Sequence, residues 1–356
     1  MKKLTLIIFF IVSIISIFGC INMYTEKQSK ALPETEVNAA SSFELETKNT
    51  QQITTEESKL ASENKTVITK KQANNKENNQ QILTNDEAIE TADSILNNIK
   101  SNQSVDLSAE KELIKYLKET NNEIVFQLII EHIKNTNSGN KDDDRLIEYS
   151  LSLLAAIDSP RASEIFFGFV KEDNWENSAA IYTVNKSISR LARNENYTGL
   201  IEQTFAQTND ESPFLNELAS GIAHNAKAEQ VDYLINYIDS DSKNKSLASS
   251  QAMIKISSEP LVPHILSYTS DNSSKDVQTA ALNSLANMGQ YEAASALIKW
   301  SSEQSSTAVD EVAALFEIAL RRSPSTKRAI EKEINDLSFN SSQIQERIIQ
   351  MADINQ

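Results

Sequence analysis

The chain has 356 residues, and its 50 acidic side chains outnumber the 34 Lys and Arg, for a formal net charge of −16. Nucleic acid is bound through clustered Lys and Arg, so this charge disfavours DNA and RNA as partners. A single Cys excludes an internal disulfide, and 6 Gly and 6 Pro are too few for a turn-rich β fold. The composition favours a helical chain.

The N-terminus has the pattern of a secretory signal. Lys2 and Lys3 precede a run over residues 4–18 that contains only three polar side chains. The following Ile17-Phe18-Gly19-Cys20 resembles the lipobox of bacterial lipoproteins, in which the cysteine is acylated and becomes the new N-terminus. The resemblance implies a signal peptide over residues 1–19 and a lipid on Cys20, with diacylglycerol on the sulfur and often a further chain, such as palmitate, on the amine.

A lipid on Cys20 also accounts for a lone thiol in an oxidising cell envelope. Position 21 is Ile rather than Asp, and by analogy with proteobacterial lipoproteins this implies the outer membrane, on its periplasmic side or at the cell surface. The alternative is an uncleaved membrane anchor. Leu4 to Thr25 is 22 residues without a charge, close to the roughly 20 that span a bilayer.

Residues 20–83 are predicted to form a disordered linker behind the lipid. The segment is rich in Asn, Gln, Thr, Ser, Lys and Glu, and its few apolar residues have no sustained period. Such a chain cannot bury enough surface to offset its conformational entropy. We interpret it as a spacer, with a binding segment as the alternative.

Residues 84–356 are predicted to be helical, because apolar residues recur at steps of three and four. In the unit Lys275 to Trp300, one apolar stripe precedes Gly289 and another follows it. Gly289 suits a helix end, where a left-handed conformation is least costly without a Cβ. The unit is therefore predicted to be a pair of helices.

This unit repeats along the chain. The second helix of each predicted pair carries an apolar doublet, and successive doublets are 36, 35, 34, 31, 32 and 32 residues apart. Helix pairs at such a period are typical of an α-solenoid. The doublets are Ile129-Ile130, Ile165-Phe166, Leu200-Ile201, Leu234-Ile235, Ile265-Leu266, Leu297-Ile298 and Ala329-Ile330.

The unit resembles HEAT-type repeats through Asp276-Val277, the small Ala280 and Ala281, and the doublet Leu297-Ile298. The resemblance implies an all-α, right-handed α-solenoid of about six to seven helix pairs, with a terminal cap near residues 341–356. The alternative is a tetratricopeptide-like repeat, since residues 289–294 look like the turn of that family.

Some helix starts are also marked in the sequence. Ser159-Pro160 and Ser212-Pro213 each place a capping hydroxyl before a proline at the first helical position. Three acids at residues 142–144 precede a predicted helix and suit its positive end.

No pattern for catalysis or metal binding is present in the sequence. His132, His224 and His264 stand in different repeats without a second ligand at metal spacing, and no Gly-x-Ser-x-Gly motif occurs. We therefore expect no enzyme, no cofactor and no metal. Basic residues that break the acidic composition are interpreted as solvated helix ends. They are Arg190, Arg193, Arg321, Arg322, Lys327 and Arg328.

Aromatic residues recur at equivalent positions of consecutive repeats. Tyr237, Tyr268 and Trp300 each stand three residues after the first member of a doublet, and Tyr233 and His264 stand one residue before it. Equivalent positions of stacked repeats lie side by side, so these residues are predicted to form a ladder that binds a partner on the second-helix face. The alternative is that they seal the contacts between repeats.

Together these observations predict a membrane-tethered scaffold of the bacterial cell envelope that binds a protein or peptide on its solenoid surface. The alternative function is a structural assembly factor of an envelope, secretion or cell-wall complex. An enzyme is the least favoured of the three.

Overall fold

A computed structural model describes residues 83–137, 139–172, 175 and 178–353 of the chain. These residues belong to one unit, Glu77–Gln356. The predicted signal peptide, Cys20 and the predicted linker up to residue 82 lie outside the described residues.

The described residues form sixteen α-helices and three short 3₁₀ helices and contain no strand, which confirms the all-α class. The first part of the unit holds α2 (Asn85–Lys100), α3 (Leu107–Thr120), α4 (Glu123–Lys134), α5 (Lys141–Ile157), α6 (Pro160–Val170), α7 (Ile181–Leu191), η1 (Glu195–Tyr197), α8 (Thr198–Gln207) and α9 (Leu215–His224). The second part holds α10 (Ala228–Ile238), α11 (Lys243–Met253), η2 (Glu259–Leu261), α12 (Val262–Ser267), α13 (Lys275–Met288), α14 (Tyr291–Ser302), η3 (Ser306–Ala308), α15 (Val309–Arg322), α16 (Pro324–Glu333) and α17 (Ser342–Met351).

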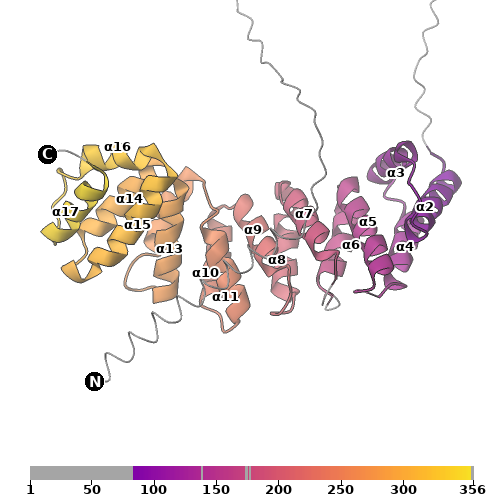
Figure 1. Cartoon of the computed structure of the whole chain (residues 1–356), viewed down its shortest axis with the longest axis horizontal. Helices are drawn as coiled ribbons and strands as arrows, with labels where there is room; N and C mark the ends of the chain where they lie inside the picture. Colours follow the sequence, from indigo (N-terminus) through magenta and orange to yellow (C-terminus); the bar gives the residue numbers. More distant parts are fainter. Residues whose placement is uncertain (1–82, 138, 173–174, 176–177, 354–356) are drawn as a thin grey trace, which may run out of the picture. The chain divides into compact units, whose positions relative to one another are not determined.

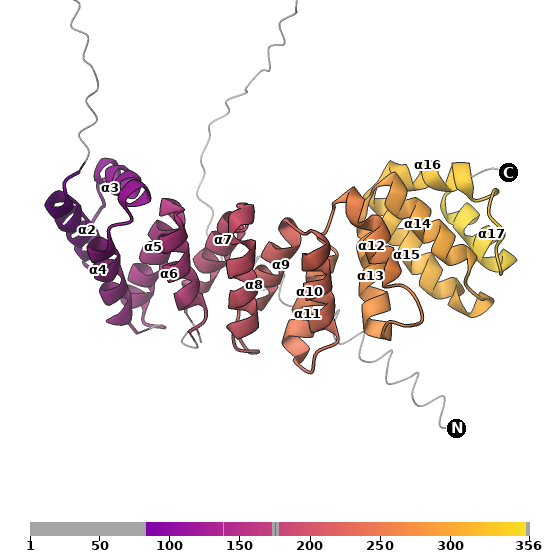
Figure 2. The ribbon, with the colours of Figure 1, turned by 180° about the vertical axis from the view of Figure 1, so that it is seen from behind.

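Helices that are close in sequence pack against each other (Figures 1 and 2). For example, α13 contacts α14 and α15, α14 contacts α16, and α15 contacts α17. Hydrogen bonds between side chains of different helices follow the same rule. They join positions from 28 residues apart, as in Ser189–Glu217, to 42 residues apart, as in Tyr291–Glu333. Contacts therefore span about one predicted repeat.

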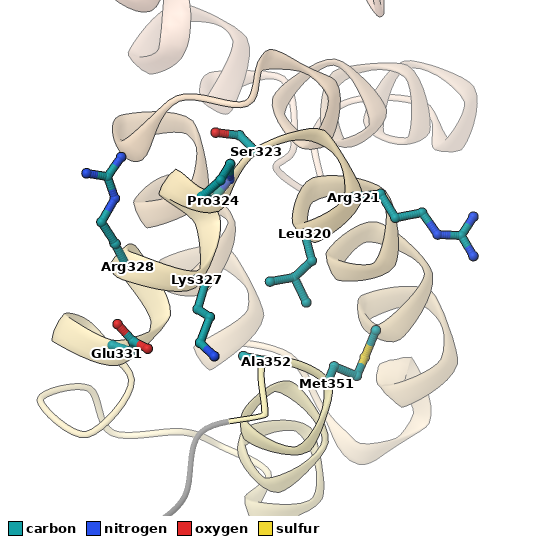
Figure 3. Close-up of a pocket in the computed structure, with 9 residues that line it drawn as sticks. All are labelled: Leu320, Arg321, Ser323, Pro324, Lys327, Arg328, Glu331, Met351 and Ala352. Atoms are coloured by element: carbon teal, nitrogen blue, oxygen red, sulfur yellow. The ribbon is translucent and has the colours of Figure 1, made fainter.

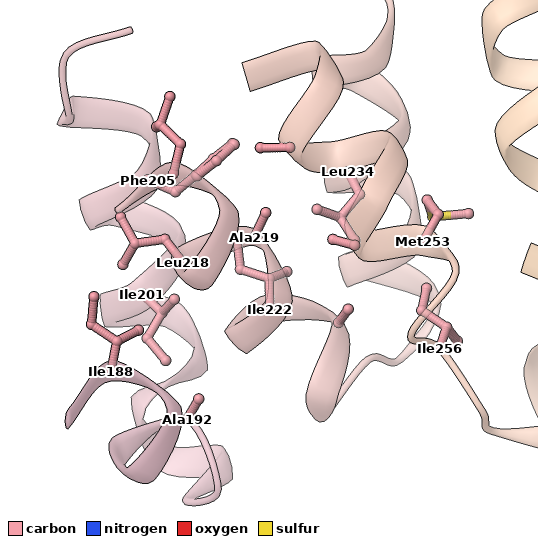
Figure 4. Packing of buried hydrophobic residues seen from close by; sticks show 14 of the residues in the cluster. Ile188, Ala192, Ile201, Phe205, Leu218, Ala219, Ile222, Leu234, Met253 and Ile256 are labelled. Carbon is pink, nitrogen blue, oxygen red and sulfur yellow. The ribbon is translucent and has the colours of Figure 1, made fainter. Parts of the chain in front are cut away.

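The seven apolar doublets lie on the even-numbered helices α4 to α16, and at least one member of each is buried. Around α8 and α9, Ile201, Phe205 and Leu218 are fully buried and lie close together (Figure 4). Burying an apolar side chain of this size stabilises the fold by about 1.5–3 kcal/mol. The doublets thus supply the core between helices.

Several predicted helix ends are confirmed. Gly289 ends α13 in the left-handed conformation, with φ +67°. Ser159 caps α6, whose first residue is Pro160, by accepting a hydrogen bond from the Ala162 amide. At the C-terminal end, α17 buries Ile344, Ile348 and Ile349.

The prediction that Ser212 caps a helix is wrong. Helix α9 begins only at Leu215, and the Ser212 hydroxyl instead accepts from the Phe214 amide at 3.3 Å. The Phe214 ring is buried edge-on against Trp175, with the ring centroids 4.9 Å apart. This packing holds residues 212–214 in a turn and delays the start of the helix.

Candidate partner-binding site

A single carboxylate joins α10 to the segment around α12. Nε2 of His264 lies 2.6 Å from Oδ1 of Asp232, and the Tyr268 hydroxyl donates to the same oxygen at 2.5 Å. His264 lies in α12 and Tyr268 caps its C-terminus, four residues later, so both side chains lie on the same face. Their rings meet edge to face, 5.6 Å apart.

The aromatic side chains of α10 pack on α8. The Tyr237 ring lies 4.9 Å from that of Phe205 and 5.1 Å from that of Tyr233. The Tyr233 hydroxyl donates to the backbone carbonyl of Glu202 at 2.7 Å. Burial, together with Tyr237 and Glu202, raises the pKa of Tyr233 above its usual range. We call Asp232, Tyr233, Tyr237, His264 and Tyr268 the α10–α12 cluster.

A buried ammonium lies beneath the aromatic part of the cluster. Lys245 of α11 donates through Nζ to the Ala206 carbonyl at 2.9 Å, and Nζ lies 5.8 Å from the Tyr237 ring centroid. Burial lowers the pKa of Lys245, and the nearby Asp210 acts in the opposite direction. The ammonium is held by a carbonyl and lies within cation–π distance of the Tyr237 ring, which favours the observed position of this ring.

The predicted ladder is only partly formed. Tyr237 contacts Tyr233, and His264 contacts Tyr268, but no ring contact joins Tyr237 to Tyr268 or Tyr268 to Trp300 in the described part of the chain. Asp232 links α10 to His264 and Tyr268 instead. Trp300 on α14 is buried, with 9% of its surface exposed, so it presents only an edge to a partner.

The α10–α12 cluster is open to water on one side. The side chains of Asp232 and His264 are 46% and 32% exposed, and Tyr233, Tyr237 and Tyr268 are half-buried. Burial and then Asp232 raise the pKa of Tyr268 to about 12. The phenol and the imidazole share one carboxylate oxygen. The arrangement therefore offers aromatic surface beside an accessible hydrogen-bond acceptor, a combination suited to anchoring a partner.

Sequence reasoning missed Asp232 and Lys245. One signal was present, because Asp232 precedes His264 by 32 residues, which is one repeat. Lys245 carried no such signal, because its acceptor is the backbone carbonyl of Ala206, which no side chain marks in the sequence.

The described residues contain no group of three His, Cys, Asp or Glu side chains placed to hold a metal ion. None of the helices among them combines the length and the apolar character that crossing a membrane requires. Of the other histidines, His132 lies 3.5 Å from Asp93, and His224 ends α9.

No protein-family model matches this chain, and no curated protein matches it either.

Proposed function

We propose that this protein is a membrane-tethered interaction scaffold of the bacterial cell envelope. In this proposal Cys20 carries the lipid, residues 21–83 form the linker, and the helical unit is a right-handed α-solenoid of HEAT-like pairs that binds a protein or peptide. The observation that carries the proposal is the α10–α12 cluster, a group of half-buried aromatic side chains around one water-accessible carboxylate, Asp232.

The solenoid part of the proposal is supported by the range of the contacts. Hydrogen bonds between side chains of different helices join residues 28 to 42 apart, and the buried doublets recur at 31 to 36 residues. In a solenoid each repeat contacts only its neighbours, so contacts of about one period are expected.

The binding part is supported by what the cluster leaves accessible. Oδ1 of Asp232 accepts from His264 and Tyr268, whereas Oδ2 accepts no hydrogen bond from the described residues. A donor on a partner, such as an amide, Lys or Arg, can bind this oxygen and pack against the neighbouring rings. The partner class we propose is therefore a protein or peptide segment that carries hydrogen-bond donors.

The lipid anchor would raise the local concentration of the scaffold near its partner at the membrane. Replacing the thiol removes the acylation site, so Cys20→Ser is expected to release the protein from the membrane fraction or to leave an unprocessed precursor. Mature protein that remains membrane-bound in this variant would contradict the lipid anchor.

Photo-crosslinking in the native cell tests the binding surface. A benzophenone amino acid is placed at Asn236, an exposed α10 position beside Tyr237 that leaves the whole cluster intact. The control position is Tyr182, an aromatic residue that is 66% exposed on α7. We expect a discrete adduct from position 236 alone, identified by mass spectrometry. Equal adducts from both positions, or none, would contradict the proposal, and an adduct with a second copy would favour an assembly factor.

A further inference from the structure

A hollow of about 520 Å³ lies among α15, α16 and α17, on helices that do not contribute to the α10–α12 cluster. Leu320, Met351 and Ala352 give it an apolar wall, and the Lys327 side chain extends over this wall toward Ala352 (Figure 3). Ala352 is buried, and Leu320 and Met351 are half-buried against the core. The hollow therefore combines an apolar wall with the ammonium group of Lys327 beside it.

The charge at this hollow is opposite to that of the chain. Lys327, Arg321 and Arg328 line it, and Glu331 is the one carboxylate that does so, in a chain of net charge −16. Arg321 is paired with Glu317 at 2.5 Å. Lys327 makes no ion pair or side-chain hydrogen bond with the described residues, so its ammonium is available to an anion.

The helix that carries Lys327 adds to this preference. Helix α16 begins at Pro324, and Ser323 and Pro324 line the same hollow. The amino end of a helix carries a partial positive charge that favours anions within its first turn. Lys327 is the fourth residue of α16, so the ammonium and the helix end favour the same ligand charge.

We propose that this hollow binds the free C-terminal carboxylate of a peptide whose last side chain is apolar. The carboxylate pairs with Lys327, and the apolar side chain packs on Leu320 and Met351. The volume is that of a small-molecule site, large enough for the end of a peptide, and the hollow is partly open to solvent. A long acyl chain would instead need an enclosed apolar tunnel. This site is additional to the proposed function and does not rest on it.

Fluorescence anisotropy with the full chain tests the site. The probe is a pentapeptide that ends in Leu and carries fluorescein at its amino end, as the free acid and as the C-terminal amide. A charge-assisted hydrogen bond between Lys327 and the carboxylate predicts that the amide binds about tenfold or more weakly than the acid. Equal binding of acid and amide, or binding of neither, would overturn the proposal.

Variants define which side chain is responsible. Lys327→Gln is expected to weaken binding of the acid peptide about tenfold. Lys327→Arg keeps the positive charge and is expected to bind the acid peptide about as well as the wild type. Lys299→Gln removes an exposed charge from α14 and is expected to change nothing. Unchanged binding in Lys327→Gln would overturn the site.

Two further measurements test whether the ligand is a fatty carboxylate and whether the peptide binds at the α10–α12 cluster. Displacement of the acid peptide by decanoate at similar concentration would overturn the assignment to peptides in favour of a fatty carboxylate. The variant Tyr268→Ala, on the α10–α12 cluster, is expected to bind the pentapeptide normally. Loss of binding in that variant would place the peptide at the cluster instead of the hollow.

Discussion

Asp144 and Asp232 make the same kind of contact in different surroundings. Asp144 at the start of α5 accepts from the Ser178 hydroxyl, 34 residues later, and Asp232 on α10 accepts from His264, 32 residues later. Each carboxylate therefore joins one predicted repeat to the next. Asp144 is only 3% exposed, whereas the Asp232 side chain is 46% exposed.

Burial decides what each carboxylate can do. Asp144 also accepts from the backbone amides of Ala179 and Gly139, at 2.8 and 3.0 Å, and no partner can reach it. At Asp232, Oδ2 accepts no hydrogen bond from the described residues, and the side chain is reached by water. From this comparison we infer that a carboxylate that joins distant segments of the chain stabilises the fold where it is buried. Where water reaches the carboxylate, it can also bind a partner.

The largest effect is expected at the buried carboxylate. Asp144→Ala removes the acceptor of three donors, of which the Ser178 hydroxyl is buried while Gly139 and Ala179 are exposed residues. A buried donor left without an acceptor costs about 1–3 kcal/mol, so the free energy of unfolding is expected to fall by about that amount. Chemical denaturation measures this. Asp142→Ala, in the same first turn but exposed, controls for the helix dipole and should cost less than about 1 kcal/mol. Equal costs would contradict the structural role of Asp144.

The open carboxylate gives a smaller and pH-dependent effect. Tyr268→Phe removes the hydrogen bond to Asp232 and is expected to cost about 1 kcal/mol at neutral pH. The folded-state pKa of Tyr268 is raised from 10.0 to about 12, so the folded protein holds a proton that the unfolded chain loses in this window. The contribution of Tyr268 is complete below pH 10 and is lost as the pH rises toward 12.

Denaturation of both proteins between pH 8 and pH 11 measures the Tyr268 effect. The stability difference between wild type and Tyr268→Phe should stay constant up to about pH 10 and shrink above it. A difference that grows with pH would contradict the assigned hydrogen bond.

An exposed ion pair gives the smallest effect. Arg161 on α6 donates to Glu123 on α4 at 2.5 and 2.9 Å, and this contact lowers the pKa of Glu123 from 4.5 to about 2. Both side chains are largely in water, so solvent screening limits the pair to about 0.2–1 kcal/mol. Arg161→Gln should cost no more than this at pH 7.

The lowered pKa of Glu123 sets the pH dependence of this pair. Its stabilisation is present above pH 4.5 and is lost as the pH falls toward 2. Urea denaturation at pH 7, 4 and 3, at low and high salt, follows the loss. If Arg161→Gln lowered the free energy of unfolding by several kcal/mol at both salt concentrations, exposure would not predict how much this ion pair contributes to stability.

The sequence predicts the local features of the fold well. The buried doublets, the end of α13 at Gly289 and the start of α6 after Ser159 all depend on residues within one or two turns. Ser212 fails as a cap because the packing of Phe214 on Trp175, which lies in a different part of the chain, decides the turn.

The candidate site could be predicted only in part for the same reason. The period of the doublets identified Tyr237 and Tyr268, which are half-buried. The same period also predicted Trp300 as a binding residue, although its side chain is buried. Asp144 was predicted only as one of three acids at a helix end. Its partners, Ser178 and Ala179, come from the next repeat, and the sequence carries no local mark of that contact.

The yield of the photo-crosslink from position 236, with and without Tyr268→Ala, tests the binding role of the open cluster most directly. Tyr268→Ala removes the hydrogen bond to Asp232 and part of a half-buried ring, so the variant should cost about 2 kcal/mol, or roughly 4–8 °C in melting temperature. Loss of an aromatic interface anchor commonly costs 2 kcal/mol or more, about 30-fold in affinity, so the adduct should nearly disappear from a folded protein. An adduct that persists while the melting temperature falls by many degrees would assign Tyr268 to the core and contradict the binding surface.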